Sequence, residues 1–376
     1  MNTGKKISLA FDSFKGSATS QQIAESASRA IRAHIPDCEI VSVPVADGGE
    51  GTTAAICSKI RTSEIKCKVH GPLMEEITVS YHITEDGSAA IMEMAAASGL
   101  PLVPAEKRNP RIATSFGTGE MILDAAKRGC KKILLGIGGS ATNDAGVGML
   151  KALGYRFTDA RGNDTSDLCA IESFDCSGLS ASLKGVEFDV ICDVTNPFYG
   201  KNGAAHVFAP QKGAGPEDVE YLDKGLEHFA GVVKRDLALD LQTVSGSGAA
   251  GGMGGGLYAF LGAKLMPGID AILNMLDFDA ALDGASLVLT GEGKIDRQTA
   301  SMGKALAGIL ARADRFGVPV VALAGAVENA DDLNALGFRA VLSIQPRPVS
   351  LEEAMNTENT LENIRKTVSQ VVRLMF

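Results

Sequence analysis

The stretch ILLGIGGSATND, residues 133–144, combines a strand pattern with a glycine-rich turn. A short apolar run of the β type leads into glycines that permit a turn too tight for side chains, and a helix-like segment follows. Strand, turn and helix in this order aim free backbone N–H groups at an anion. A second stretch, LVLTGEGKID at residues 287–296, predicts the same arrangement with charged residues after the glycines. Together they predict a phosphate-handling crevice, with a nucleotide as the first ligand to consider.

Other segments repeat the alternation of strand and helix. Residues 7–11 predict a buried strand, and residues 19–35 predict a helix in which Thr19 and Gln22 are spaced as a capping box. Further elements are expected as strands at 39–45, 132–135, 286–289, 318–323 and 339–343 and as a helix at 304–316. This alternation is typical of an α/β fold built on a parallel sheet.

Two stretches do not follow this rhythm. Alternating runs at 77–83 and 89–94 predict antiparallel strands joined by a turn at Asp86-Gly87. Later strand candidates lie at 155–159 and 188–192, ahead of a glycine-rich tract at 246–256. We therefore expect a second α/β domain, inserted twice into the first. The expected boundaries are 1–70, 111–153 and 280–376 for the first domain, and 71–110 and 154–279 for the inserted one.

Composition limits the function classes. The chain has 376 residues, a net charge of -9 and 45% hydrophobic residues, so a broad nucleic-acid or anionic-membrane surface is not expected. An anionic substrate therefore needs a local pocket of Lys or Arg. The seven cysteines are scattered without a C-x-x-C pair, which argues against structural zinc or a disulfide framework. No apolar stretch approaches the roughly 18 residues of a membrane span, and no signal peptide is recognisable, so a cytoplasmic protein is expected.

Polar residues follow the first two expected strands. Asp12, Ser13 and Lys15 come directly after the first, at the strand end where open α/β sheets bind ligands, although a plain charged turn explains them equally well. The second is followed by DGGEGT, which includes Asp47, Gly48 and Gly49. Two carboxylates and three glycines exceed what a plain connection needs, so this loop is a candidate for metal binding or proton transfer.

The glycine-rich segments differ in specificity. Gly138 to Thr142 predicts a phosphate cradle or, more simply, an N-cap; no Walker A string occurs in the chain. A literal G-x-G-x-x-G occurs at Gly246, Gly248 and Gly251, but residues 236–245 before it do not predict a clean buried strand. We expect that tract to be a flexible or close-packed helix start rather than a dinucleotide fingerprint.

Acidic residues also follow two later strands. Asp193 ends the strand candidate at 188–192 and is either a functional carboxylate or a cap. Glu292, Lys294 and Asp296 crowd a further strand end, where a lysine can bind phosphate and carboxylates can hold Mg²⁺. The alternative there is a surface ion-pair cluster, which the surrounding glycines do not favour.

Six blocks, in this order, closely resemble the class I glycerate kinases over nearly the whole chain. They are residues 12–17, 45–52, 136–146, 192–197, 248–254 and 290–296. The resemblance implies ATP-dependent phosphorylation of D-glycerate, in bacterial members generally at the 2-hydroxyl. It also implies a Rossmann-like domain with an inserted α/β domain.

Phosphoryl transfer needs positioning, charge neutralisation and a carboxylate near the attacking hydroxyl. On this hypothesis the base is Asp193, with Asp47 as its rival, and Lys15 with Ser13 binds the glycerate carboxylate. The remaining assignments are to substrate for Asp12, Gly48, Gly49 and Asn196, to ATP phosphates for Gly138, Gly139, Ser140, Ala141, Thr142 and Lys294, and to Mg²⁺ for Glu292 and Asp296.

Three other functions stay open on the residues alone. They are phosphorylation of glycerate at the 3-hydroxyl, a dinucleotide-dependent dehydrogenase using the tract at 246–251, and a nucleotide sensor without turnover. The weak strand context argues against the dehydrogenase, and the acidic residues at strand ends argue against the sensor. The oligomeric state is open, with a homodimer as one arrangement.

Overall fold

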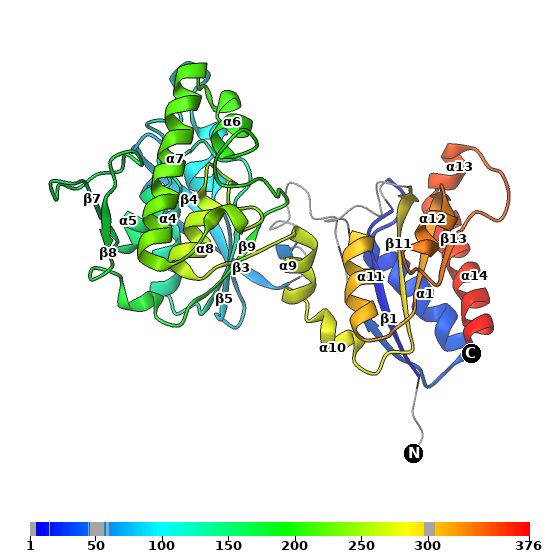
Figure 1. The fold of residues 1–376 in the computed structure, drawn as a ribbon. Helices are drawn as coiled ribbons and strands as arrows, with labels where there is room; N and C mark the ends of the chain where they lie inside the picture. The colour runs from blue at the N-terminus through cyan, green and yellow to red at the C-terminus, as the bar shows by residue number, and fades with distance from the viewer. Residues whose placement is uncertain (1–4, 15, 44, 46–55, 58–59, 297–304) are drawn as a thin grey trace. The chain divides into compact units, whose positions relative to one another are not determined.

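A computed structural model describes residues 5–14, 16–43, 45, 56–57, 60–296 and 305–376. The chain divides into two compact units, which we call unit 1 (Met1–Thr52 and Gly268–Phe376) and unit 2 (Thr53–Pro267). In Figure 1 the blue, orange and red elements belong to unit 1, and the cyan and green elements belong to unit 2. Unit 2 is thus one continuous insertion into unit 1.

Unit 1 is built on a five-stranded, fully parallel sheet with the strand order β13-β12-β11-β1-β2. Its strands are β1 (Lys6–Phe11), β2 (Glu39–Ser42), β11 (Leu287–Ile295), β12 (Val320–Val327) and β13 (Ala340–Ser343). Its helices are α1 (Ser20–His34), α9 (Gly268–Met275), α10 (Phe278–Leu282), α11 (Ala305–Arg315), α12 (Ala330–Ala335), α13 (Leu351–Met355) and α14 (Thr357–Met375).

The core of unit 1 follows from the alternation along its strands. Ile7, Leu9 and Phe11 of β1 are buried in one cluster with apolar side chains of α1 and α14, which pack together (Figure 1). Helix α1 begins with the predicted capping box, in which the Thr19 hydroxyl accepts from Gln22 N–H and the Gln22 side chain accepts from Thr19 N–H. The expected strand and helix of this first βα pair are confirmed.

The strand order of unit 1 contains a topological switch point. From β1 the chain continues to β2 on one side, whereas β11 lies on the other side of β1. Phe11 is in register with Gly291, and Asp12 N–H donates to the Gly291 carbonyl at 3.0 Å. Open α/β sheets bind ligands outside the carboxyl ends of their strands at such a point. Asp12 and the middle of β11 therefore lie where this architecture places a ligand.

Unit 2 contains a six-stranded mixed sheet with the order β10-β9-β6-β5-β4-β3 and a two-stranded sheet, β7-β8. The strands are β3 (Thr62–His70), β4 (Glu76–Thr84), β5 (Ala89–Glu93), β6 (Lys132–Gly136), β7 (Arg156–Thr158), β8 (Ser173–Asp175), β9 (Glu187–Ile191) and β10 (Lys264–Met266). The helices are α3 (Ala95–Ser98), α4 (Phe116–Lys127), α5 (Val147–Leu153), α6 (Ala204–Phe208), α7 (Pro216–Leu237) and α8 (Met253–Leu261).

The parallel half of this sheet brings two loops together. Strands β5, β6, β9 and β10 are parallel, and β6 is in register with β9 so that Gly136 lies opposite Ile191. The loops that leave β6 and β9 therefore start at the same level of the sheet. The other half, β3 to β5, is antiparallel, with the predicted turn at 85–88 between β4 and β5.

The α/β fold class is confirmed, but the domain division differs from the expected one. Strand β3 and strand β6, with helices α4 and α5, were expected in the first domain, and all of them belong to unit 2. The reason is strand pairing: β3 pairs with β4 along its whole length, and β6 lies between β5 and β9. Helix α9 in turn belongs to unit 1, so unit 1 resumes at Gly268 instead of residue 280.

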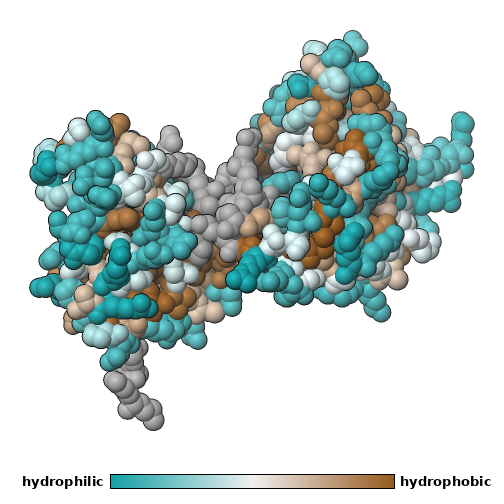
Figure 2. All heavy atoms as spheres, turned by 180° about the vertical axis from the view of Figure 1, so that it is seen from behind, coloured by the Kyte–Doolittle hydropathy of each residue, from teal (hydrophilic) through white to brown (hydrophobic). Residues whose placement is uncertain are grey.

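Polar and charged side chains cover most of the face drawn in Figure 2, with apolar patches between them. Scattered exposed apolar residues of this kind are normal for a folded protein. Within the described residues, no helix is both long and apolar enough to span a membrane.

Candidate active site

The helix after the β6 loop does not present free N–H groups to a ligand. Helix α5 starts only at Val147, and the N–H groups of its first turn already have hydrogen-bond acceptors. The Asp144 carboxylate accepts hydrogen bonds from the N–H groups of Gly146 at 3.1 Å and Gly148 at 3.2 Å, and from Ser115 N–H and Oγ. The predicted sequence of strand, turn and helix is present, but Asp144 occupies the helix N-terminus that we expected to face phosphate.

The loop itself offers two exposed backbone donors. Gly138 and Gly139 are exposed, and their N–H groups have no hydrogen-bond acceptor among the described residues. Gly139 has a φ of 72°, a conformation that glycine adopts without strain. Ser140, Ala141 and Thr142 are buried, and the Ala141 N–H donates to the Ser98 carbonyl. Of the five residues predicted to cradle phosphate, only Gly138 and Gly139 face solvent.

The neighbouring strand supplies the predicted carboxylate. Asp193 follows β9 by two residues, just as Gly138 follows β6, and its side chain is exposed. Asn196 is half-buried and donates from Nδ2 to the Asn202 carbonyl at 2.9 Å, which closes the loop behind Asp193. The structure therefore brings the predicted phosphate loop and the predicted base to adjacent strand ends of unit 2.

The glycine tract at 246–256 holds these two loops together. A Cβ on Gly248 would lie 2.1 Å from the Pro197 carbonyl oxygen, and a Cβ on Gly251 would lie 2.1 Å from that of Thr142. Gly248 N–H donates to the Asn196 carbonyl, and the Gly251 carbonyl accepts from Ala145 N–H. These glycines are required for close packing of the three segments, as the close-packed alternative predicted. The element directly before them is a 3-10 turn at Leu241–Thr243, not a strand.

Lys212, which contacts the loop after β6, was not singled out by the sequence analysis. It ends the short 3-10 turn Pro210–Lys212, and its Nζ donates to Ser140 Oγ at 2.6 Å and to the Thr142 carbonyl at 2.7 Å. Burial lowers the pKa of Lys212 from its usual 10.5 to about 7, against the opposing effect of Asp144. A lysine in a short turn normally predicts a solvated side chain, so no sequence signal marked it.

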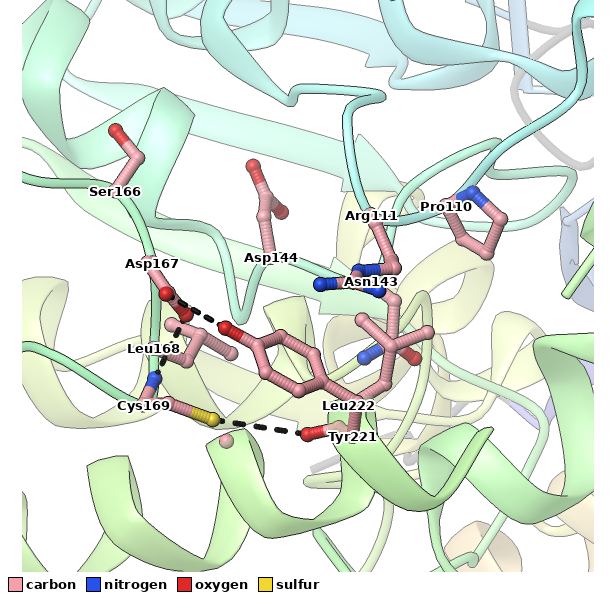
Figure 3. A pocket seen from close by; sticks show the side chains of 11 residues that line it. Pro110, Arg111, Asn143, Asp144, Ser166, Asp167, Leu168, Cys169, Tyr221 and Leu222 are labelled. Atoms are coloured by element: carbon pink, nitrogen blue, oxygen red, sulfur yellow. Dashed lines mark hydrogen bonds between the residues drawn. The ribbon is translucent and has the colours of Figure 1, made fainter. Parts of the chain in front are cut away.

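Several buried polar atoms in the β6 loop and the glycine tract lack a hydrogen-bond partner among the described residues. Thr142 Oγ1, both side-chain polar atoms of Asn143, and Ser247 Oγ have no hydrogen-bond partner in the described part of the chain. Asn143 lines a cavity of about 50 Å³ that also includes Arg111 and Tyr221, whose hydroxyl points to Asp167 in Figure 3 and donates to it at 2.6 Å. This cavity can hold a water molecule or two but is too small for a nucleotide.

In unit 1 the predicted substrate residues lie at the switch point. Asp12 is 7% exposed, and its Oδ1 accepts from Ser13 N–H at 2.6 Å and lies 3.4 Å from Ser13 Oγ, which donates to it. Ser13 is half-buried beside it. Lys15, Asp47, Gly48 and Gly49 lie outside the described residues.

The second predicted glycine turn is wrong. Strand β11 runs through residues 287–295 and pairs with β12 as far as Ile295 opposite Val327, so TGEGKI continues the strand. Gly291 serves strand packing, because a Cβ there would lie 2.0 Å from the Leu323 carbonyl oxygen. Glycine runs usually indicate turns, and here the close approach of a neighbouring strand is what requires glycine.

The charged residues of β11 share one side of the strand. Glu292 and Lys294 alternate with Gly291, Gly293 and Ile295, and Asp296 follows the strand. Lys294 is exposed, and its Nζ lies 3.0 Å from Glu328 Oε1 and 3.6 Å from Asp296 Oδ2. The hydrogen bond that Lys294 donates to the Glu328 carboxylate is the main reason why the pKa of Lys294 is raised. An ion-pair cluster, the alternative to a phosphate-binding lysine, is thus present.

The donor set of unit 1 is compatible with magnesium. Glu292 of β11 and Asp296, which directly follows this strand, offer carboxylate oxygens, which Mg²⁺ prefers together with water and substrate phosphates. The described residues contain no ready-made group of three or more acidic, histidine or cysteine ligands. A site of this kind would need phosphate oxygens to complete it.

Comparison with known proteins identifies the family. A sequence model of the Glycerate kinase family matches residues 7–376. The chain is 45% identical to Glycerate 2-kinase of Escherichia coli K12 over 93% of both chains, and 42% identical to Glycerate kinase of Bacillus cereus over 98% of both. A crystal structure from Salmonella typhimurium LT2, assigned as a glycerate kinase 2, has 42% identity and a TM-score of 0.76, covering 99% of this chain and 98% of that one. This chain belongs to the glycerate kinase family.

Proposed function

We propose that this protein transfers the γ-phosphoryl group of ATP to the 2-hydroxyl of D-glycerate, giving 2-phosphoglycerate and ADP. Membership of the glycerate kinase family supports the activity, and the 45% identical relative named Glycerate 2-kinase supports the position of transfer. The structural observation that carries the proposal is the meeting of the Gly138–Gly139 loop and Asp193 at adjacent strand ends of unit 2.

Each residue of this pair has a role that phosphoryl transfer requires. The N–H groups of Gly138 and Gly139, which have no acceptor within the described residues, are proposed to bind phosphate oxygens, because backbone donors stabilise the charge that those oxygens carry. The exposed Asp193 carboxylate is proposed to orient the attacking hydroxyl and to accept its proton as the new O–P bond forms. Asp47 is retained as the rival base.

The remaining assignments stay with the residues predicted for them. Asp12, Ser13, Lys15 and Asn196 are proposed to orient glycerate, Ser13 and Lys15 at its carboxylate. Glu292 and Asp296 are proposed to hold Mg²⁺, which would neutralise charge on the ATP phosphates. Lys294 pairs with Glu328 in the ligand-free protein and is proposed to contact a phosphate of the nucleotide.

A coupled assay tests the function and the position of transfer together. Purified protein with ATP, Mg²⁺ and D-glycerate should yield phosphoenolpyruvate at once when enolase is present without phosphoglycerate mutase. ADP formation with no phosphoenolpyruvate until mutase is added would mean transfer to the 3-hydroxyl. ADP that does not form at all would refute the kinase proposal.

The variant Asp193→Asn tests whether Asp193 is the base or only a structural cap. The variant should lower kcat by about a hundredfold or more while its circular dichroism spectrum and melting temperature stay close to wild type, because Asp193 is exposed. Asp159→Asn is a control, since Asp159 is a half-buried carboxylate outside the proposed site that closes the turn at 159–163. Near-normal turnover of Asp193→Asn would transfer the role to Asp47.

A further inference from the structure

Lys212 is held in place by its backbone as well as its side chain. Lys212 N–H donates to the Ala209 carbonyl, and Gly213 N–H donates to that of Pro210. Gly213 follows with a φ of 98° and packs so closely on Arg108 that a Cβ would lie 2.4 Å from the Arg108 carbonyl oxygen. The turn therefore directs the lysine side chain into the protein, where only 2% of the residue is exposed.

The partners of Lys212 are neutral. Its Nζ donates to the hydroxyl of Ser140 and the carbonyl of Thr142, and no described carboxylate lies within ion-pair distance of it. Asp144 is the charged group that acts on it, but its oxygens already accept four hydrogen bonds from Ser115, Gly146 and Gly148. When Lys212 is protonated, its charge is therefore not cancelled by a direct ion pair.

A buried lysine of this kind is costly. Ordering the side chain costs rotamer entropy, and burying an ammonium group without a counter-charge costs solvation free energy as well. Apolar residues would fill the same space at lower cost. Lys212 contacts Ser140 and Thr142, which come just after Gly138 and Gly139. The N–H groups of these two glycines are exposed and have no acceptor among the described residues. A positive charge beneath that loop is complementary to an anion bound on its outer side.

We propose that Lys212 is a positioning residue of the nucleotide site: from beneath the loop, it holds Ser140 and Thr142 so that Gly138 and Gly139 present their N–H groups to the phosphates of ATP. It also adds a positive charge without touching the nucleotide, because its ammonium group is buried. This inference rests on the proposed binding of phosphate at Gly138 and Gly139.

The test compares Lys212→Met with Lys132→Met. Methionine has nearly the volume of lysine without its charge, and Lys132 lies at the opposite, amino end of β6, where its Nζ pairs with Asp189 Oδ2 at 2.9 Å. We expect Lys212→Met to raise KM for ATP about tenfold or more while KM for D-glycerate changes less than about twofold. Lys132→Met is expected to lose stability and leave both KM values unchanged. An equal rise of both KM values in Lys212→Met, or no rise, would overturn the proposal.

A pH profile gives a readout that a purely structural lysine would not affect. Since the pKa of Lys212 is about 7 without ligand, ATP binding by the wild type should weaken from about pH 7 to about pH 9, by up to about tenfold per pH unit. ATP binding by Lys212→Met should lack this pH dependence. Identical pH profiles for the two proteins would refute the proposed role of the Lys212 charge in ATP binding. The measurement is equilibrium binding of ATP, so it also distinguishes failure of this inference from absence of kinase turnover.

If Lys212→Met does not fold, Ser140→Ala removes one of the two acceptors instead. Ser140 Oγ is buried against Lys212 Nζ, so its loss loosens the loop without removing the lysine. We expect a smaller rise of KM for ATP, about threefold, with KM for glycerate unchanged. An unchanged KM for ATP would count against the positioning role.

Discussion

A change from about pH 7 to about pH 8.5 should stabilise the ligand-free protein through Lys212. Its pKa is about 7 in the folded protein, whereas an unfolded lysine keeps a value near 10.5. Between these values the unfolded chain binds one more proton at this position than the folded chain does. Stability therefore rises with pH across this window, and it is independent of this group below the folded value, where both states are protonated.

The size of the effect follows from the two pKa values. A full proton of difference corresponds to about 1.4 kcal/mol per pH unit, and the folded group is half-protonated at about pH 7. Integrated to about pH 8.5, the gain is about 1.6 kcal/mol. With a urea dependence of roughly 2–3 kcal/mol per molar, the unfolding midpoint should rise by about 0.6 M.

Urea unfolding followed by circular dichroism at the two pH values measures this gain in wild type and in Lys212→Met. The difference between the proteins is the informative quantity, because thiols with raised pKa values, such as Cys67 and Cys192, lower stability on the alkaline side in both. We expect the wild type to gain about 1.6 kcal/mol relative to the variant. A relative change near zero, or a loss, would refute the assignment of Lys212 as a buried, largely desolvated amine.

Three further substitutions test the packing of unit 2. Gly251→Ala should destabilise unit 2 by about 3 kcal/mol or more, because Gly251 has a φ of 68° and a Cβ would clash with the Thr142 carbonyl; a loss below about 1 kcal/mol on urea unfolding would contradict this. Tyr81→Phe removes a buried hydroxyl that donates to Asp124 at 2.7 Å and should cost about 1–2 kcal/mol, so an unchanged melting temperature would count against that bond. Lys132→Met leaves the buried Asp189 carboxylate unpaired and should cost about 1–3 kcal/mol, recovered in part in the double variant with Asp189→Asn; no recovery would mean that the ion pair is not the cause.

Local structure was predicted well where neighbouring residues decide it. The capping box of Thr19 and Gln22 forms as expected, because its hydrogen bonds connect residues three apart. The turn at Asp86-Gly87 also forms, since Gly87 takes the left-handed backbone that the sequence anticipates. Asp12 and Asp193 also lie just after buried strands, as predicted. An apolar run that ends in a carboxylate can be recognised locally in the sequence, which is why this prediction succeeded.

Predictions failed where a distant segment decides the outcome. Residues 132–136 have the same pattern as a strand of unit 1, and only pairing with β5 and β9 places them in unit 2. A glycine such as Gly291 usually indicates a turn. Here it lies within a continuous strand, where the nearby Leu323 carbonyl on β12 leaves no room for a side chain.

The α/β class, most strand positions, the family resemblance and the residues proposed to handle phosphate can all be derived from the sequence. Three features depend on the tertiary structure: which strands share a sheet, the hydrogen bonds of Asp144 to the start of α5, and the position of Lys212 beneath the β6 loop. The two groups differ in the range of the interactions that set them. Hydrophobic periodicity and caps act within a few residues, whereas strand partners and buried charges depend on contacts such as that between Lys212 and Ser140, 72 residues apart.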